Sequence, residues 1–468
     1  MPEEFGYNDF EEHRARQRAI EFEKKLQRNE WFFLDLVQVD EIFHYYAQSG
    51  EYSKAQRLLQ YALRTYPFHP DLYFKRARLN LELGRTEDAL EDIDTALTYS
   101  PYNQAFHLLR ADVLARAGRY EEARTLLEDL LARTDQPEEV LLQLGNVAQV
   151  CNRPRESEHY YRQALQAAPG FEDALLELAF LFEAEDRFQE AIQLYQGYLD
   201  VDPYAANVWY NLGLLYRKMG DYALALEALD FAVVIIGDFA LAYAQKGQVL
   251  MDLGHYETAL QAFLEAGGIT PKDPNALYQI ADCYEQLERY RDALRYYRRV
   301  SEADPEYIDA WMGMGFCLEK EERFLEAIHY YHKAFSLDDE NEEACLALAI
   351  CEYKIGNLHS SSLFLERAMT LAPHDHAVWQ DWAELLYEND NLEGAIVYLE
   401  EGIRRNASYP ELYYQCAAYC LLGGWEEKGL IYLENALALH HAGHALLFQI
   451  EPTLQEDPLV AELIEQYA

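Results

Sequence analysis

Three cysteines recur at a constant interval, which is the first pattern in the chain that could support chemistry. Cys283, Cys317 and Cys351 lie 34 residues apart, and thiolates are ligands for zinc. Equivalent positions of successive helical repeats are about 8–10 Å apart, whereas each sulfur must lie about 2.3 Å from a shared zinc ion. Val147 and Leu215 occupy the same column. We therefore interpret the three cysteines as small buried hydrophobic residues.

The remaining candidate metal ligands have the same kind of explanation. Cys416 and Cys420 lie four residues apart on one expected helix, at positions that face the core. His440, His441 and His444 form the one histidine cluster, and the sequence supplies no further ligands beside it, so a solvated loop is favoured. No metal ion and no other cofactor is expected.

A basic run interleaved with tyrosines could indicate nucleic-acid binding. It contains Arg289, Arg291, Arg295, Arg298 and Arg299 together with Tyr290, Tyr296 and Tyr297. The chain carries 82 acidic and 39 basic side chains, a formal charge of −43, which repels phosphates. A solvated helix face is the favoured interpretation, and a docking patch for an acidic partner is the alternative.

The sequence contains none of the motifs of the common enzyme classes. A phosphate loop, a dinucleotide glycine fingerprint, an HExxH zinc helix and a GxSxG elbow are all missing. Adjacent carboxylates are uninformative in so acidic a chain. We predict a protein that is not an enzyme and has no catalytic residues.

The elements that must position any site follow from an internal repeat. A column of small residues has a period of 34: Ala55, Ala89, Ala123, Ser157, Ala191, Ala225, Ala259, Ala293, Ala327, Ser361, Ala395 and Gly429. A second small column lies twelve residues earlier, and only Phe43 is large in it. Small residues let two antiparallel helices cross closely, so each repeat is expected to form one helix pair.

The turns within and between these pairs can also be placed. A residue that accepts a left-handed backbone is expected between the two helices of each unit: Gly50, Gly84, Gly118, Asn152, Asp186, Gly220, Gly254, Gly356, Asp390 and Gly424, with Glu288 and Glu322 as exceptions. The second helix should end before a proline, which cannot continue a helix: Pro67, Pro101, Pro169, Pro203, Pro271, Pro305 and Pro373.

With these features the chain resembles the tetratricopeptide repeat (TPR) family. The residues that carry the resemblance most clearly are Trp209, Leu212, Gly213, Tyr216, Ala225 and Ala232. The period extends it over residues 36–443 as about twelve tandem repeats, similar to multi-repeat proteins of the bacterial cytoplasm. The resemblance implies an all-α fold, a right-handed superhelical α-solenoid of antiparallel helix pairs. It also implies that the first helix of each pair lines a concave groove.

The two ends differ from the repeats and are expected to cap them. Residues 1–35 are predicted to form a helical extension or cap in which Trp31, Phe32, Phe33 and Leu34 cover the first repeat, with a partner-binding arm as the alternative. Residues 444–468 are predicted to form capping helices. There Asp457 and Pro458 suit a helix start, followed by a stripe of Val460, Leu463, Ile464 and Tyr467.

The exposed positions of the first helices are the candidate binding site. The predicted positions combine amide and apolar side chains: Gln143, Asn146, Phe180, Asn207, Tyr210, Asn211, Gln245, Gln248, Asn275, Tyr278, Gln279, Met312 and Phe316. Tyr414 is predicted to lie in the same groove. An amide can pair with the backbone of an extended peptide without reading its sequence. The alternative is that these are tolerated surface residues, because the chain contains 37 tyrosines.

Charge and composition narrow the function and its setting. Acidic groove edges favour a neutral or basic protein or peptide, and the basic positions of a chaperone carboxylate clamp are not matched. The first residues lack a signal-peptide core, the longest apolar run is short, and the seven cysteines include no CxxC pair, so we expect a cytoplasmic protein that does not insert in a membrane. The predicted function is a non-catalytic interaction scaffold or adaptor. A structural spacer within a larger complex is the alternative, and a sensor of a small peptide or nucleotide is a weaker one.

Overall fold

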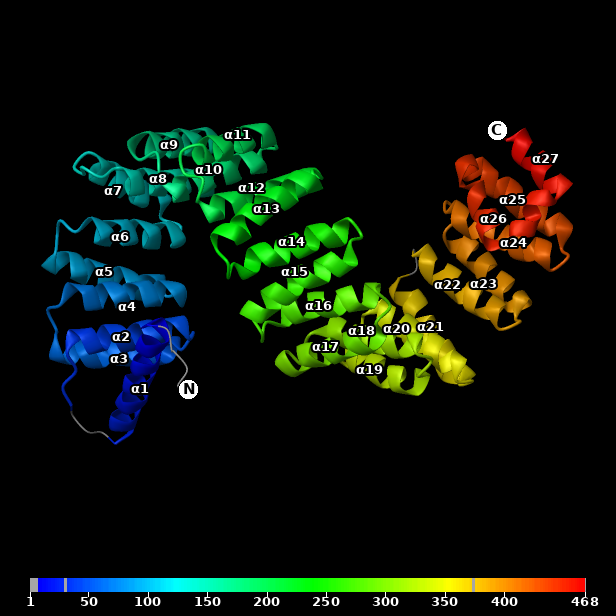
Figure 1. Ribbon diagram of the computed structural model, residues 1–468, viewed down its shortest axis with the longest axis horizontal. Helices are drawn as coiled ribbons and strands as arrows, with labels where there is room; N and C mark the ends of the chain where they lie inside the picture. Colours follow the sequence, from blue (N-terminus) through cyan, green and yellow to red (C-terminus); the bar gives the residue numbers. More distant parts are fainter. Residues whose placement is uncertain (1–6, 29–31, 373–374, 468) are drawn as a thin grey trace. The chain divides into compact units, whose positions relative to one another are not determined.

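The computed structural model describes residues 7–28, 32–372 and 375–467 (Figure 1). Within these ranges every regular element is a helix, so the predicted all-α fold class is confirmed. The chain divides into two compact units, Met1–Met219 and Gly220–Ala468, and each is described by itself below. The predicted boundaries at 35/36 and 443/444 stay predictions.

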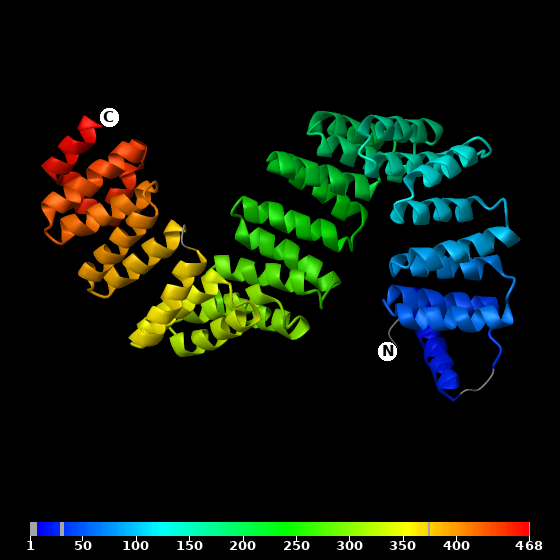
Figure 2. The ribbon, with the colours of Figure 1, turned by 180° about the vertical axis from the view of Figure 1, so that it is seen from behind.

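The first unit contains twelve described helices that follow one another in chain order (Figures 1 and 2). They are α1 (Tyr7–Gln27), α2 (Leu36–Gln48), α3 (Tyr52–Thr65), α4 (Pro70–Glu82), α5 (Thr86–Tyr99), α6 (Gln104–Arg116), α7 (Tyr120–Leu131), α8 (Glu138–Val150), α9 (Pro154–Ala167), α10 (Glu172–Ala184), α11 (Phe188–Leu199) and α12 (Ala206–Met219).

The second unit continues the same alternation of helices. It contains α13 (Tyr222–Ile235), α14 (Ala240–Asp252), α15 (Tyr256–Ile269), α16 (Pro274–Gln286), α17 (Tyr290–Ala303), α18 (Ile308–Lys320), α19 (Phe324–Leu337), α20 (Glu342–Lys354), α21 (Leu358–Leu371), α22 (His376–Glu388), α23 (Leu392–Arg405), α24 (Pro410–Leu422), α25 (Glu426–His440), α26 (Ala445–Ile450) and α27 (Pro458–Gln466). Two short 3-10 turns, His441–His444 and Pro452–Glu456, lie among the last helices.

The small residues of the repeat lie where paired helices touch, as predicted. At Gly145 on α8, an added Cβ would lie 2.2 Å from a ring carbon of Tyr161 on α9. At Gly315 on α18, it would lie 2.5 Å from a ring carbon of Tyr331 on α19. Both rings are buried. At each close crossing, a large ring of one helix therefore packs directly against the glycine of the other helix, which has only a hydrogen atom as its side chain.

Every turn within a repeat adopts the left-handed backbone conformation, including the two that were expected to be exceptions. Positive φ angles occur at all ten predicted glycine, asparagine and aspartate positions. Glu288 and Glu322 have φ angles of 56° and 59°, so calling these two exceptions was wrong. The geometry of the helix pair overrides the preference of glutamate for negative φ.

An aromatic side chain ties several first helices to the turn before them, and the sequence analysis did not predict this contact. The Trp209 indole Nε1 donates to the carbonyl oxygen of Pro203 at 2.9 Å. The equivalent Trp311 donates to Pro305 at 3.0 Å. The ring thereby satisfies a carbonyl of the turn between repeats, a group that no helix pairs.

The two ends pack on the outermost repeats. Ala19 and Phe22 of α1 are buried against the first helix pair. Trp31 lies outside the described residues. Phe32 and Leu34 pack on the same core, whereas Phe33 is 61% exposed and is not part of the expected cover.

The C-terminal helix α27 begins as the sequence predicted. The Asp457 carboxylate accepts hydrogen bonds from the backbone N–H groups of Leu459 and Val460, which is the N-cap arrangement. Val460 is fully buried, and Leu463 and Ile464 pack on the core of the second unit. Three residues of the predicted apolar stripe therefore face the last repeats, whereas the fourth, Tyr467, is 37% exposed.

The candidate metal ligands have structural roles in the described part of the chain. Cys283, Cys317 and Cys351 are at most 1% exposed, which confirms their interpretation as core residues. The solvated loop expected for the histidines is wrong for His441 and His444, which form a half-buried 3-10 turn because the ring of His441 contacts the carbonyl oxygen of Ile464 at 3.2 Å. Among the described residues, no group of three potential ligands is placed to hold a metal ion.

None of the described helices combines the length and apolar character needed to cross a membrane.

Candidate functional site

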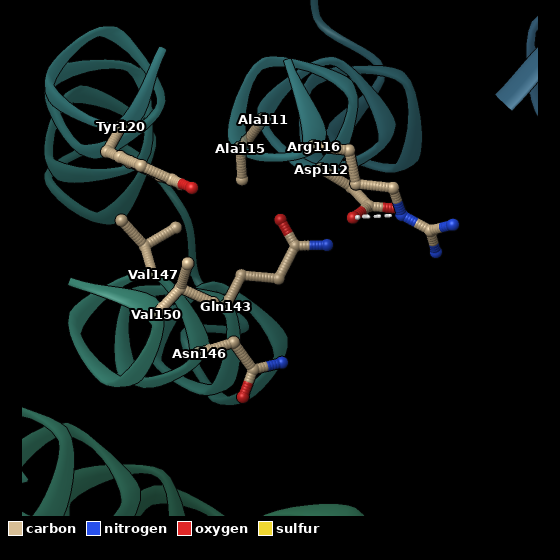
Figure 3. Close-up of a pocket in the computed structure, with 9 residues that line it drawn as sticks. All are labelled: Ala111, Asp112, Ala115, Arg116, Tyr120, Gln143, Asn146, Val147 and Val150. Carbon is tan, nitrogen blue, oxygen red and sulfur yellow. Dashed lines mark hydrogen bonds and ion pairs between the residues drawn. The ribbon is translucent and has the colours of Figure 1, made fainter. Parts of the chain in front are cut away.

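A pocket of about 590 Å³ lies on the first helices of the first unit, between α6 and α8 (Figure 3). It contains two of the predicted site residues, Gln143 and Asn146. Its lining consists of Ala111, Asp112, Ala115, Arg116, Tyr120, Gln143, Asn146, Val147 and Val150. Its volume falls in the range of about 300–1,000 Å³ that is usual for ligand pockets.

Small side chains on α6 open this pocket. Ala111 and Ala115 are four residues apart and therefore share one face of the helix. Val147 and Val150 of α8 form the opposite wall, and the ring of Tyr120, from the start of α7, lies at the side between the walls (Figure 3). The walls are thus mainly apolar, and polar groups stand at a few defined points.

Some polar groups of the pocket have hydrogen-bond partners within the chain, and one does not. The Asp112 carboxylate accepts from Nε of Arg116 at 3.2 Å, and Asn146 Oδ1 accepts from the Tyr161 hydroxyl at 2.7 Å. The Gln143 carboxamide stands between α6 and α8, with its oxygen turned toward α6 (Figure 3). That oxygen, Oε1, is buried and has no hydrogen-bond partner. Leaving such an acceptor unpaired costs about 1–3 kcal/mol.

The other predicted positions of the first unit are mostly engaged within the chain. Asn207 donates from Nδ2 to Glu172 at 2.9 Å. Asn211 donates from Nδ2 to the backbone oxygen of Asn207 at 2.8 Å, so its amide caps a carbonyl of its own helix. Burial raises the pKa of the Tyr210 phenol. Phe180 differs from these residues, because it is 59% exposed.

In the second unit, the predicted amides lie along α14 and α16. Gln245, Gln248 and Gln279 are half-buried, and Nε2 of Gln248 donates to Asp252 at 3.3 Å. The exposed Asn275 accepts from the Tyr307 hydroxyl at 3.4 Å. These residues keep part of their surface open.

The predicted aromatic positions of the second unit belong to ring clusters. The Tyr278 ring centroid lies 5.3 Å from that of Tyr307 and 5.7 Å from that of Tyr297. Phe316 is covered by the ammonium of Lys320, at 5.0 Å from its centroid. Met312 packs on a neighbouring core cluster. Rings held in this way offer rigid contact area at a low cost in entropy.

One predicted groove residue is not in a groove. Tyr414 on α24 is fully buried, and its hydroxyl donates to the backbone oxygen of His440 at 2.8 Å. The C-terminal helices cover this position, so the repeat register alone could not show that it is closed.

Acidic groups on the first helices are partly desolvated, which disfavours their charged form. Burial raises the pKa of the Asp282 carboxyl. Burial also raises the pKa of Glu285, a hydrogen bond from Tyr297 opposes this shift, and the nearby Asp282 adds to it. In the first unit, burial and then Asp173 raise the pKa of Glu177. A neutral or cationic ligand is therefore more favourable beside these carboxylates than an anionic one.

The sequence analysis missed most of the pocket wall. Asp112, Arg116, Tyr120 and Val150 were not named, and Val147 was named only as a member of the cysteine column. A signal was present, because Ala115 stands where the neighbouring repeats carry the larger Leu81 and Gln149. A small residue between larger ones in the adjacent repeats indicates a local hollow.

Comparison with solved structures gives matches of low sequence identity. MamA is 23% identical and matches with a TM-score of 0.34, covering 36% of this chain and 91% of its own. YrrB, described as a TPR protein with an unusual peptide-binding site, is 20% identical with a TM-score of 0.36, covering 42% and 97%. Yeast Tom70 is 15% identical with a TM-score of 0.40, covering 92% and 99%.

Comparison with curated protein sequences gives no match at the threshold applied. Family models described as tetratricopeptide repeat match residues 41–103, 81–144, 173–233, 210–274, 250–315 and 308–341. Together they span residues 41–144 and 173–341, which is more than half of the chain, and they agree with the helix pairs described above. The chain belongs to the tetratricopeptide repeat family.

Proposed function

We propose that this protein is a non-catalytic scaffold that binds an extended segment of a partner protein on its first-helix faces. The observation that carries the proposal is the pocket between α6 and α8, which combines apolar walls with the amides of Gln143 and Asn146. Apolar anchors together with a few placed polar groups are the usual means of holding a peptide. Membership in the tetratricopeptide repeat family supports an interaction role.

The partner segment is expected to be neutral or basic. The chain carries 82 acidic against 39 basic side chains, and carboxylates such as Asp282 and Glu285 lie on first helices with raised pKa values. A basic segment would be steered toward this surface, and its association rate would fall as salt rises.

The cytoplasm remains the proposed compartment. All seven cysteines are free thiols, and only Cys151 is not buried. Free thiols in this number suit a reducing environment.

A peptide-display selection on the full-length chain tests the function. Peptides that are enriched are then measured against two double variants: Gln143→Ala with Asn146→Ala in the first unit, and Gln245→Ala with Gln279→Ala in the second. Loss of two amides should weaken binding by about tenfold on the face that is used. Helical content should not change, because alanine is the best helix former.

The matched control changes two glutamines away from the first helices. Gln189 and Gln193 are exposed on α11, four residues apart, and their replacement by alanine should leave binding unchanged. If selected peptides bind both double variants as tightly as the unmodified chain, the segment does not lie on the first-helix faces and the proposal is wrong.

A structural spacer is the second candidate function, favoured by an apolar stripe on second helices of the second unit. Leu363, Val397 and Ile431 occupy one column of the repeat on α21, α23 and α25, and they are 55%, 62% and 55% exposed. Such a stripe is typical of an assembly surface. Changing all three to serine should abolish capture of an assembly partner while peptide binding remains. If capture persists, this candidate fails.

A further inference from the structure

We propose that the pocket between α6 and α8 is a specificity site for a tryptophan side chain of the bound segment. This inference rests on the proposed function and adds to it the identity of one anchor residue. It is argued from the pocket walls, from one unpaired acceptor and from the charges around it.

The walls suit a large flat apolar ring. Ala111 and Ala115 provide one wall, and Val147 and Val150 the other, with the Tyr120 ring beside them (Figure 3). These residues carry no charge. Aromatic side chains bury a large apolar area and lose little rotamer freedom when they do so. Tryptophan is the residue most enriched among strong anchors at interfaces.

The unpaired oxygen of Gln143 selects for a hydrogen-bond donor. Oε1 is buried without a partner, so the free protein already bears the cost of an unsatisfied acceptor. The last torsion of a glutamine side chain is broad, so rotation about it can exchange the carboxamide oxygen with the NH2 group and turn the oxygen to a ligand in the pocket. An indole N–H is a donor and cannot accept, which matches a site whose unsatisfied group is an acceptor.

The neighbouring charges disfavour the other anchors. A lysine or arginine would need a carboxylate, but Asp112 is already bound by Arg116, whose positive charge would repel a second cation. A phenylalanine would fill the pocket and leave the Gln143 oxygen unpaired. Tyrosine also combines an uncharged ring with a donor, but its hydroxyl is in addition an acceptor that would need a partner of its own. The indole of tryptophan provides the larger ring and a donor alone.

The test uses tryptophan analogues as probes on the full-length chain. Methyl groups of valine are isotope-labelled, and the signals of Val147 and Val150 are followed by NMR during titration with N-acetyl-tryptophanamide. The same titration is repeated with the analogue methylated on the indole nitrogen and with N-acetyl-phenylalaninamide. We expect saturable shifts with the first probe and binding about tenfold weaker with the other two, because each lacks the donor.

Variants separate the pocket from general stickiness. Gln143→Met keeps the size of the side chain and removes the acceptor. This variant should therefore bind the indole probe and the methylindole probe with equal affinity. Ala115→Leu should block all three probes, and leucine is compatible with this helix position because Leu81 occupies it one repeat earlier. Gln193→Met on α11 is the matched control and should bind like the unmodified chain. Circular dichroism confirms that each variant is folded.

The outcomes distinguish this inference from the proposed function. If selected peptides depend on Gln143 and Asn146 but contain no tryptophan, and the indole probe does not shift Val147 or Val150, the anchor is wrong and the scaffold function stands. Equal affinity for the indole and methylindole probes would also overturn the anchor, because the hydrogen bond would then play no part. If no peptide is selected on the first-helix faces, the proposed function itself fails.

Discussion

Glu288 and Glu322 show how the repeat imposes its backbone on single residues. Both have φ angles near the values of Asn152 and Asp186, although a glutamate in this conformation costs about 1–2 kcal/mol. Glycine accepts the conformation freely but loses more entropy on folding. We therefore expect Glu288→Gly to stabilise the second unit by about 0.5–1 kcal/mol, measured by urea unfolding or by amide exchange of α16 and α17.

The reverse change is the control for this prediction. Gly254 occupies the same place with a φ angle of 72°, and Gly254→Ala should destabilise the second unit by about 1 kcal/mol. If Glu288→Gly lowers stability instead, the glutamate side chain contributes more than its backbone strain costs.

At the scale of the helix pair, the crossing of α8 and α9 depends on the absence of one carbon atom. A Cβ at Gly145 would lie 2.2 Å from the buried Tyr161 ring, so Gly145→Ala should destabilise the first unit by about 1–3 kcal/mol. The preceding repeat solves the same crossing with Ala111 and Leu127. Adding Tyr161→Leu to Gly145→Ala should therefore recover much of the loss, which a double-mutant cycle of urea midpoints would measure.

If the losses of stability caused by the two single changes simply add in the double variant, the pair of alanine and leucine cannot replace the pair of glycine and tyrosine at this crossing. The Tyr161 hydroxyl bonds to both Asn146 and Gln149, so the double variant also frees two amides. Recovery is accordingly expected to be incomplete.

The helix pairs and most of their turns could be predicted from the sequence because small residues, and residues that accept a left-handed backbone, recur at a fixed period. Gly145 and Asp457 are examples in which size and capping chemistry determine the local structure alone. The candidate site was harder to predict. Tyr414 is closed by the C-terminal helices, and Asn211 uses its amide on its own helix. Neither contact follows the period, since one depends on the end of the array and the other on a side-chain torsion.

At the scale of the whole molecule, the dominant property is negative charge, and some of the carboxyl groups that carry it are half-buried. Desolvation raises the pKa values of Glu177, Glu183 and Asp282 above their ordinary values. Salt-bridged carboxylates such as Glu158 shift the other way, because Arg187 and Arg162 lower its pKa. Carboxyl groups with raised pKa values and those with lowered pKa values therefore affect folding stability in different pH ranges.

The sign of the pH dependence follows from which state binds more protons. A carboxyl whose pKa is raised by folding, such as Glu285 with its ordinary value of 4.5, stays protonated in the folded state at pH values where the unfolded chain has lost the proton. Folding stability must then fall as pH rises above about 4.5, in the same direction as the repulsion from a net charge of −43. Below that range, protonation of Glu158 removes its attraction to arginine and stability falls again.

We therefore expect the urea midpoint of the second unit to be higher at about pH 4.5 than at about pH 7.5, when unfolding is followed by probes in α16 and α17. Glu285→Gln should flatten this dependence, because an amide can still accept the hydrogen bond that Tyr297 donates at 2.8 Å but does not titrate. Added salt should reduce the part that comes from net charge and leave the Glu285 part. An unchanged slope in Glu285→Gln would show that long-range repulsion, and not this half-buried carboxyl, sets the response.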